Sequence, residues 1–221
     1  MSSLSELSAR PCRLSREPNT VTRAWTSYYA AEIDQKISKT PISDFLAEQV
    51  FNPLGMNRTV LGPGSFQLSG TILSQTEYAA PGSGSGAVEA KNWDWNSAYW
   101  RNFGGPWGGA HGTATDVARF LNSFLIPDGT VLKTSTAIKM IQNHNIGLDV
   151  PRGHGFKLGS DGFGKGCSVR TFGYGGSTGR LAWADPDKNR LCVILTSLPA
   201  RKSRDLILDQ VGDLISSYSK N

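Results

Sequence analysis

Residues 172–198 read FGYGGSTGRLAWADPDKNRLCVILTSL, and this stretch decides the fold. A glycine-rich turn at 175–179 joins two of its apolar runs, and a polar turn at 185–189 joins the second run to a third. The runs GHGFKLGS and VRTFGYG come before it in the chain. Short apolar runs separated by tight turns are typical of adjacent antiparallel strands. The sequence therefore predicts an antiparallel meander after Pro151.

The turn at 175–179 also spells G-x-S-x-G, the pattern around the nucleophilic serine of many hydrolases. That serine needs a strand before it and a helix after it, and its histidine must come later in the chain. Here another apolar run follows Ser177, and all three histidines, His111, His144 and His154, precede it. The sequence thus disfavours Ser177 as an α/β-hydrolase nucleophile and keeps that reading as a third hypothesis.

Helical periodicity dominates the rest of the chain. We expect helices over 25–38 and 40–50, the second capped by Thr40 with Pro41 in its first position. Thr113 and Asp116 predict a capping box before an amphipathic helix, and a short helix follows near 135–142. Another helix is expected over 203–218, with these side chains facing inward: Ile207, Val211, Leu214, Ile215 and Tyr218. Helices followed by a strand meander and a closing helix predict an α+β fold.

Residues 57–110 show no sustained period, and long irregular segments in compact domains are commonly binding loops. Four of the six tryptophans fall in this segment. We expect Trp100 and Trp107 to line a cleft for an apolar or aromatic substrate. The alternative is that the tryptophans anchor the loop to the body of the protein.

Bulk composition narrows the function classes. The net charge of +5 over 221 residues comes from scattered basic residues, which argues against a nucleic-acid partner. Three distant cysteines indicate neither a disulfide framework nor a redox pair, and the histidine spacing matches no metal motif. We expect no metal and no cofactor. The sequence shows no membrane span and no secretory signal peptide, and it leaves the cellular location open.

Three segments carry a resemblance. PISDFLAEQVFNPLGMNRT (41–59), GGAHGTATDVARFLNSFLIPDG (108–129) and FGYGGSTGRLAWADPDKNRLCVILTS (172–197) resemble, in order and spacing, the downstream part of the serine β-lactamase-related family. That family includes class C β-lactamases, penicillin-binding D,D-peptidases and β-lactamase-like esterases. The resemblance covers about 28–218 and implies a β-lactamase/transpeptidase-like fold, in which helices and a helical lobe flank an antiparallel sheet.

The resemblance also implies a site. Members use the serine and lysine of S-x-x-K, a Y-x-N loop and a K-T-G-like triplet on a strand beside the reacting bond. Tyr174-Gly175-Gly176 stands at the triplet, so Tyr174 and Ser177 are the implied catalytic positions, with the N–H of Ser177 as the oxyanion donor. Gly175 and Gly176 would let the substrate approach the strand closely. A plain turn between strands is the alternative.

This sequence departs from the family pattern in three respects. Tyr174 replaces the usual lysine or histidine, which removes a cation that would attract a β-lactam carboxylate. The only S-x-x-K is Ser217 to Lys220, and no Y-x-N occurs. We therefore expect a chain that lacks the nucleophile helix and first strands of its family and is inactive as written.

The function hypotheses follow from these departures. The first is a serine hydrolase acting on a small ester, amide or peptide through an acyl-enzyme, represented here by its downstream part. The second is a non-catalytic relic or binding module of the same fold. We expect a poorly patterned segment at 1–24, a helical lobe with long loops at 25–150, and strands with a C-terminal helix at 151–218. An exposed sheet edge could also support association.

Overall fold

The computed structural model describes residues 24–80 and 88–218. Its main sheet has four strands in sequential order: β3 (Lys157–Leu158), β4 (Phe172–Gly176), β5 (Arg180–Asp185) and β6 (Arg190–Leu195). All neighbours are antiparallel, which confirms the predicted meander. The run GHGFKLGS contributes only the two residues of β3.

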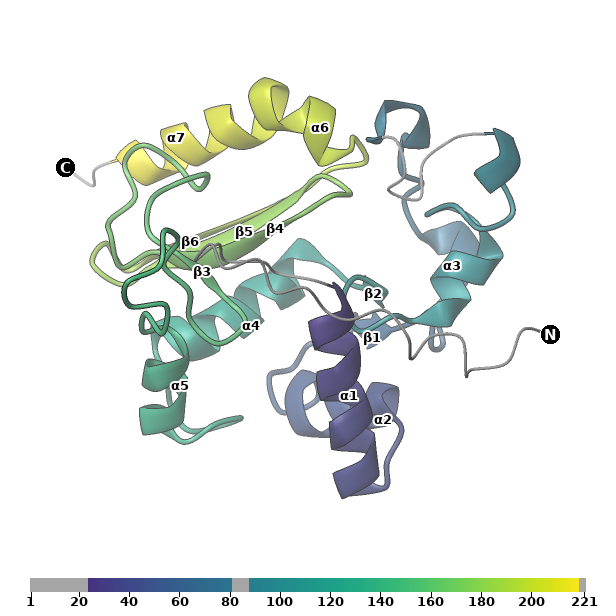
Figure 1. Cartoon of the computed structure of the whole chain (residues 1–221), viewed down its shortest axis with the longest axis horizontal. Coiled ribbons are helices and arrows are strands. Elements are labelled where there is room, and N and C mark those ends of the chain that lie inside the picture. The colour runs from purple at the N-terminus through teal and green to yellow at the C-terminus, as the bar shows by residue number, and fades with distance from the viewer. Residues whose placement is uncertain (1–23, 81–87, 219–221) are drawn as a thin grey trace.

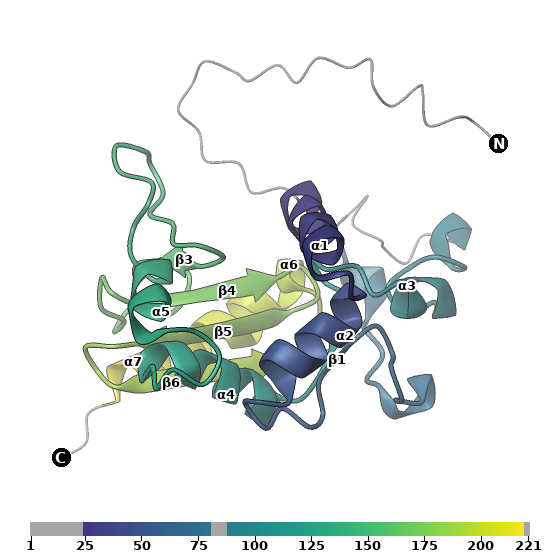
Figure 2. The ribbon, with the colours of Figure 1, turned by 90° about the horizontal axis from the view of Figure 1, so that it is seen from below.

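Helices cover both faces of this sheet (Figures 1 and 2). On one face lie α4 (Ala114–Leu125) and α5 (Thr134–Met140), where Phe124 and Phe156 pack against Phe172. On the other face the C-terminal helices pack over Trp183, whose side chain is fully buried. Helices flanking an antiparallel sheet confirm the predicted α+β class.

Helix α4 begins as the sequence predicts, but the side chain of Asp116 does not complete the predicted capping box. The hydroxyl of Thr113 accepts the N–H of Asp116 at 3.3 Å, which is half of a capping box. The side chain of Asp116 does not return to Thr113. It accepts the Arg58 N–H at 2.9 Å, the Thr59 hydroxyl at 3.0 Å and the Arg119 guanidinium at 2.8 Å. This buried carboxylate therefore joins α4 to the loop that follows residue 55.

The C-terminal helix is confirmed, but its predicted inward face is only partly right, because Ile207, Val211 and Ile215 are half-buried whereas Leu214 and Tyr218 are exposed. It runs through α6 (Ala200–Ser203), a π-helical turn at Arg204–Leu208 and α7 (Asp209–Ser217). A π-turn adds one residue to the winding and rotates everything after it. Leu208 and Ser216 are consequently buried, while Leu214 and Tyr218 are 69% and 64% exposed.

The N-terminal part of the described chain is built from helices and short strands. Helices α1 (Ala24–Ser38) and α2 (Ile42–Leu46) precede a second π-turn at Ala47–Phe51. Thr40 does not cap α2, because Pro41 occupies the N-cap position and the Thr40 hydroxyl donates to the Ser38 carbonyl at 3.3 Å. The remaining elements are β1 (Val60–Leu61), paired with β2 (Ala110–His111), three single 3₁₀ turns and α3 (Ala98–Phe103).

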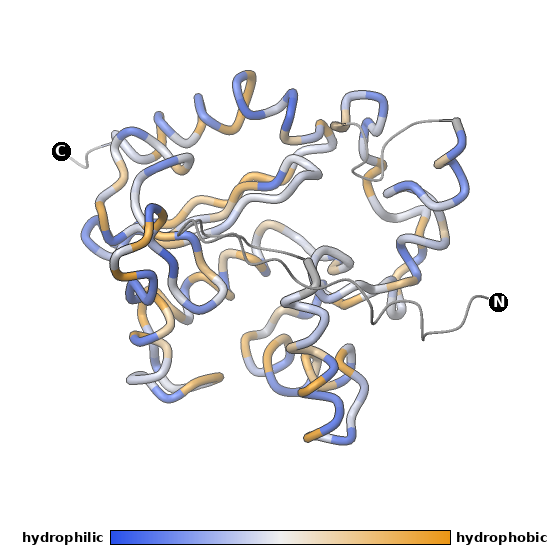
Figure 3. Tube along the Cα trace, viewed as in Figure 1, coloured by the Kyte–Doolittle hydropathy of each residue, from blue (hydrophilic) through white to orange (hydrophobic). Residues whose placement is uncertain are grey.

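Figure 3 shows hydrophobic residues along the strands and α4, with polar residues frequent on the outer turns of the helices. This distribution is that of a core between a sheet and its covering helices. Among the described helices, none is long and apolar enough to cross a bilayer.

Candidate active site

The triplet predicted from the sequence lies on a partly open strand. β5 pairs with β4 along its whole length, from Phe172 to Gly176. On the other side β3 pairs only with Phe172 and Gly173. Within residues 24–80 and 88–218, no strand covers the edge of β4 from Tyr174 onward. The backbone at Tyr174, Gly175 and Gly176 is thus the part of the sheet that an extended ligand could approach.

The N–H of Ser177 faces this open edge. The carbonyl of Gly176 accepts the N–H of Gly179 at 3.0 Å and therefore points into the hairpin turn. The Gly176–Ser177 peptide is planar and trans, so its N–H points the opposite way, away from β5. No described residue accepts this N–H. A free N–H held in one direction is what an oxyanion donor requires.

The turn that holds this N–H is anchored to the chain beyond β6. The Ala200 N–H donates to the Ser177 carbonyl at 2.9 Å, and the Thr196 N–H donates to the Gly179 carbonyl at 3.1 Å. Gly179 has φ +81°, and a Cβ there would collide with the Leu198 carbonyl oxygen. Gly179 therefore meets two requirements at once, a left-handed backbone and a close approach.

The structure around Ser177 also differs from the strand–turn–helix elbow that holds the nucleophile of an α/β-hydrolase. Three residues after the serine the chain enters β5, whereas an elbow needs a helix at that place. The imidazoles are engaged elsewhere. His144 and His154 stack with ring centroids 4.0 Å apart, and His111 Nδ1 lies 3.1 Å from the Gly62 carbonyl oxygen. Burial lowers the pKa of His111.

Tyr174 is accompanied by a cation. Its side chain is 43% exposed, and the guanidinium carbon of Arg152 lies 5.6 Å from its ring centroid. This separation is within the range of a cation–π contact. A positive charge thus lies beside the triplet, although the triplet itself contains none. The sequence gave no sign of this contact between Arg152 and Tyr174.

The structure brings Trp100 and Trp107 together, with ring centroids 6.2 Å apart. Phe103 lies 5.6 Å from the Trp107 ring, and Tyr28 of α1 lies 6.4 Å from it. Trp107 is 37% exposed. These four aromatic rings form an aromatic cluster between α1 and α3. Both views place α1 and α3 beyond the Ser177 end of β4 (Figures 1 and 2). A role in substrate binding stays a prediction.

Sequence reasoning missed the residue that holds this region together. The buried guanidinium of Arg101 donates to the Ile72 carbonyl at 3.1 Å, the Asn96 side chain at 3.1 Å and the Trp95 carbonyl at 3.3 Å, and also to the Thr71 hydroxyl. Gln75 then ties the loop to the segment after β6, because its N–H and its side-chain amide each donate to Ser197 at 2.8 Å. A lone arginine among tryptophans gave no signal for this.

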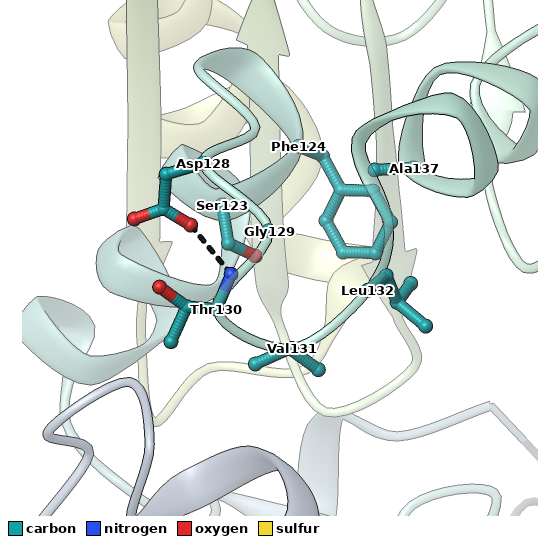
Figure 4. Close-up of a pocket in the computed structure, with 8 residues that line it drawn as sticks. All are labelled: Ser123, Phe124, Asp128, Gly129, Thr130, Val131, Leu132 and Ala137. Carbon is teal, nitrogen blue, oxygen red and sulfur yellow. Dashed lines mark hydrogen bonds between the residues drawn. The ribbon is translucent and has the colours of Figure 1, made fainter.

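The small pocket of Figure 4 lies apart from these residues. It has room for about one water molecule beneath the turn after α4, where the Thr130 N–H donates to Asp128 at 2.9 Å. None of the predicted site residues lines it. Among the described residues, no cluster of His, Cys, Asp and Glu could hold a metal ion.

The comparisons with known proteins agree with this geometry. A family model described as Beta-lactamase matches residues 13–214. The chain belongs to the β-lactamase family. Among curated proteins, a lovastatin esterase from Penicillium rubens is 26% identical over 192 residues, which cover 74% of this chain and 47% of that protein.

Solved structures share the fold of this chain. A β-lactamase from Mycobacterium bovis superposes with a TM-score of 0.62 at 22% identity, over 90% of this chain and 65% of that one. Unliganded simvastatin synthase from Aspergillus terreus gives a TM-score of 0.64 at 16% identity, over 87% and 55%. EstCE1, a hydrolase with promiscuous acyltransferase activity, gives 0.64 at 18% identity, over 85% and 54%.

These matches fix the family and the relative lengths. The chain spans about half the length of the curated relative it matches. Hydrolase, esterase and β-lactamase-like relatives support membership in a hydrolase family.

Proposed function

We propose that this chain forms the oxyanion-donating and substrate-binding part of a serine hydrolase that acts on a small ester or amide through an acyl-enzyme. The observation that carries the proposal is the N–H of Ser177, which has no acceptor in the described chain and faces the open edge of β4. A donor of this kind stabilises the developing oxyanion, and removing one typically costs a few kcal/mol of transition-state stabilisation.

The other residues have supporting roles in this proposal. Gly175 and Gly176 leave the strand edge free of side chains, and Tyr174 borders the reacting bond. The aromatic cluster, through Trp100 and Trp107, contacts an apolar part of the substrate. The relatives named lovastatin esterase and simvastatin synthase support a bulky apolar substrate rather than a peptide.

The nucleophile is the remaining question. The sequence holds no S-x-x-K other than Ser217 to Lys220, so we propose that the 221 residues alone form no acyl-enzyme. The intact mass of the protein from its source cells is the first measurement. A mass well above 23.9 kDa supports the hydrolase and directs the search for S-x-x-K upstream. A mass of 23.9 kDa supports the alternative, a non-catalytic binding module.

A matched pair of variants tests the oxyanion donor. Ser177 occupies the second position of a turn closed by Gly179, with no positive φ at Ser177 or at the next residue, and proline is favoured there. Ser177→Pro removes the N–H, whereas Ser177→Ala removes only the hydroxyl. With p-nitrophenyl butyrate and the native-length protein, we expect kcat to fall about 100-fold in S177P and to change little in S177A. Equal activity of S177P and wild type would refute the assignment.

A further inference from the structure

A groove of about 430 Å³ lies in the N-terminal part of the described chain, and neither Tyr174 nor Ser177 lines it. Its walls are formed by α2, β1 and the end of α3, together with Gln35 of α1. Figure 2 shows α2 beside β1. Phe103 is the one member of the aromatic cluster that lines the groove. The groove is therefore distinct from the turn and the triplet of the proposed hydrolase site.

Hydrogen bonds and close packing fix the shape of this groove. Gln35 Oε1 accepts the Ile42 N–H at 2.9 Å and so joins α1 to α2. The Gly62 N–H donates to the Gly109 carbonyl at 2.9 Å, which holds the chain that follows β1. A Cβ at Gly104 would lie 3.1 Å from the Gly62 backbone, so the end of α3 packs directly on that segment. Small-molecule sites are usually largely preformed, and this groove has that property.

The groove contains one charged side chain, the carboxylate of Asp44. No lysine, arginine or histidine of the described chain lines the groove, and Asp44 belongs to no ion pair within that part of the chain. The Ser43 hydroxyl donates to this carboxylate at 3.2 Å. Although the whole chain has a net charge of +5, the side chains of this groove thus carry a net negative charge.

The end of α3 adds to this negative charge. The helix ends at Phe103, and no hydrogen bond from the N–H of Gly104, its C-cap, returns to the helix. No described residue donates to the carbonyl of Asn102, which is a lining residue. Unpaired carbonyls at a helix C-terminus carry partial negative charge and favour a cation. Arg101 lies in the same helix, but its guanidinium is bound to acceptors in residues 71–96 and does not line the groove.

The other walls are apolar. Ile42, Val60 and Leu61 line the groove, and the Phe103 side chain is 49% exposed. The face of an accessible aromatic ring attracts cations. From this combination we infer that the groove binds a small organic cation, a protonated amine or a quaternary ammonium joined to an apolar group. The ammonium lies between Asp44 and the end of α3, and the apolar group lies against Val60 and Leu61.

Two matched probes titrated into the full, isotope-labelled chain test the inference, with amide NMR shifts as the readout. The probes are phenethylamine, a cation at neutral pH, and its neutral analogue phenethyl alcohol. We expect the amine to bind about fivefold more tightly at low salt, and the preference to shrink as salt screens the charge. The largest shifts should occur at the N–H groups of Leu61, Gly62 and Gly104. Equal binding of the two probes, or shifts centred on the triplet strand, would overturn the inference.

Variants of Asp44 give the decisive comparison. Asp44→Asn keeps the shape of the side chain and removes its charge, so we expect it to abolish most of the preference for the amine while alcohol binding stays the same. Glu48→Gln is the matched control, because Glu48 is also exposed and lies one turn further along the chain, outside the groove. It should leave the preference intact. An unchanged preference in D44N would contradict the inference.

Two further variants locate the site and separate it from the proposed function. Ala47 lines the groove, so Ala47→Leu should fill part of it and weaken both probes, while the amide spectrum of the free variant reports whether the fold is kept. Probes that bind folded A47L as tightly as wild type bind elsewhere, and the inference is then wrong. Ser177→Pro should change the binding of neither probe. Full hydrolytic activity in S177P would refute the oxyanion assignment and leave the cation site standing.

Discussion

The N–H of Gly179 donates to the carbonyl oxygen of Gly176, and this single bond sets the direction of the Ser177 N–H. The peptide plane transmits the constraint from one side of the hairpin to the other. The turn that carries the G-x-S-x-G motif therefore fixes the direction of a backbone N–H, and this N–H is the group to which we assign the oxyanion role in the proposed function.

Gly179→Ala should destabilise the protein more than its backbone angle alone predicts. At φ +81° an alanine costs about 1–2 kcal/mol, and its Cβ would also collide with the Leu198 carbonyl. Gly147→Ala is the matched control, because Gly147 has φ +83° with open space around it. Urea unfolding should show G179A less stable than G147A by at least about 1 kcal/mol. Equal losses would mean that the Leu198 contact does not constrain the turn.

Asp116→Asn should loosen the join between α4 and the loop around Arg58. The carboxylate accepts three hydrogen bonds, including one from a guanidinium, and an amide cannot accept all of them. We expect a loss of about 2–4 kcal/mol in the free energy of unfolding. Asp128→Asn, at an exposed turn beyond the other end of α4, should cost much less. A mild D116N would show that the network is replaceable.

The buried carboxylate of Asp185 makes stability depend on acid. Burial alone would raise the pKa of Asp185, but hydrogen bonds from Ser168 and Asp187 outweigh it and the pKa is lowered. Its contribution is therefore present above the unfolded-state pKa of about 3.9 and is lost as the pH falls through the lower folded-state value.

Urea titrations from pH 7 into the acid range check this dependence. Asp185→Asn should lower stability at neutral pH by about 1–3 kcal/mol and flatten the acid dependence. Asp187→Asn, at an exposed ion pair, should do neither. An unchanged acid slope in D185N would assign the dependence to other carboxylates.

Cys192 should be inert while the protein is folded. Burial, together with the nearby Cys167, raises the pKa of the Cys192 thiol to about 11, so almost no thiolate exists at pH 8. In a Cys12→Ser, Cys167→Ser variant, a disulfide reagent such as DTNB should label Cys192 only slowly, and urea should accelerate labelling by more than about 100-fold. Rapid labelling of the folded variant would show that the segment opens readily.

Much of this fold could be predicted because its elements obey simple periods. The meander from Phe172 to Leu195 and the amphipathic helix at Ala114–Leu125 carry patterns that neighbouring residues alone determine. The position of the triplet followed from the order of motifs along the chain. These features depend little on contacts between residues that are far apart in the sequence.

The remainder depended on contacts that no local pattern encodes. The placement of Arg152 over Tyr174 requires the loop before β3 to fold back on β4. The hydrogen bonds of Arg101 go to acceptors whose distances along the sequence follow no helical or strand period. The inward face of the last helix was predicted only in part for another reason, because a period of 3.6 residues does not hold through a π-turn.

That π-turn gives the C-terminal helix an adjustable length. Deleting one residue between Arg204 and Leu208 would convert the turn to ordinary α-helix, because the lost residue is the one that the π-turn adds. Leu208 and Ser216 would then still face the sheet, and Leu214 would still face solvent. The segment can therefore absorb a single-residue deletion without changing its packing surface, which a regular α-helix could not do, because each residue removed from it rotates the rest by roughly 100°.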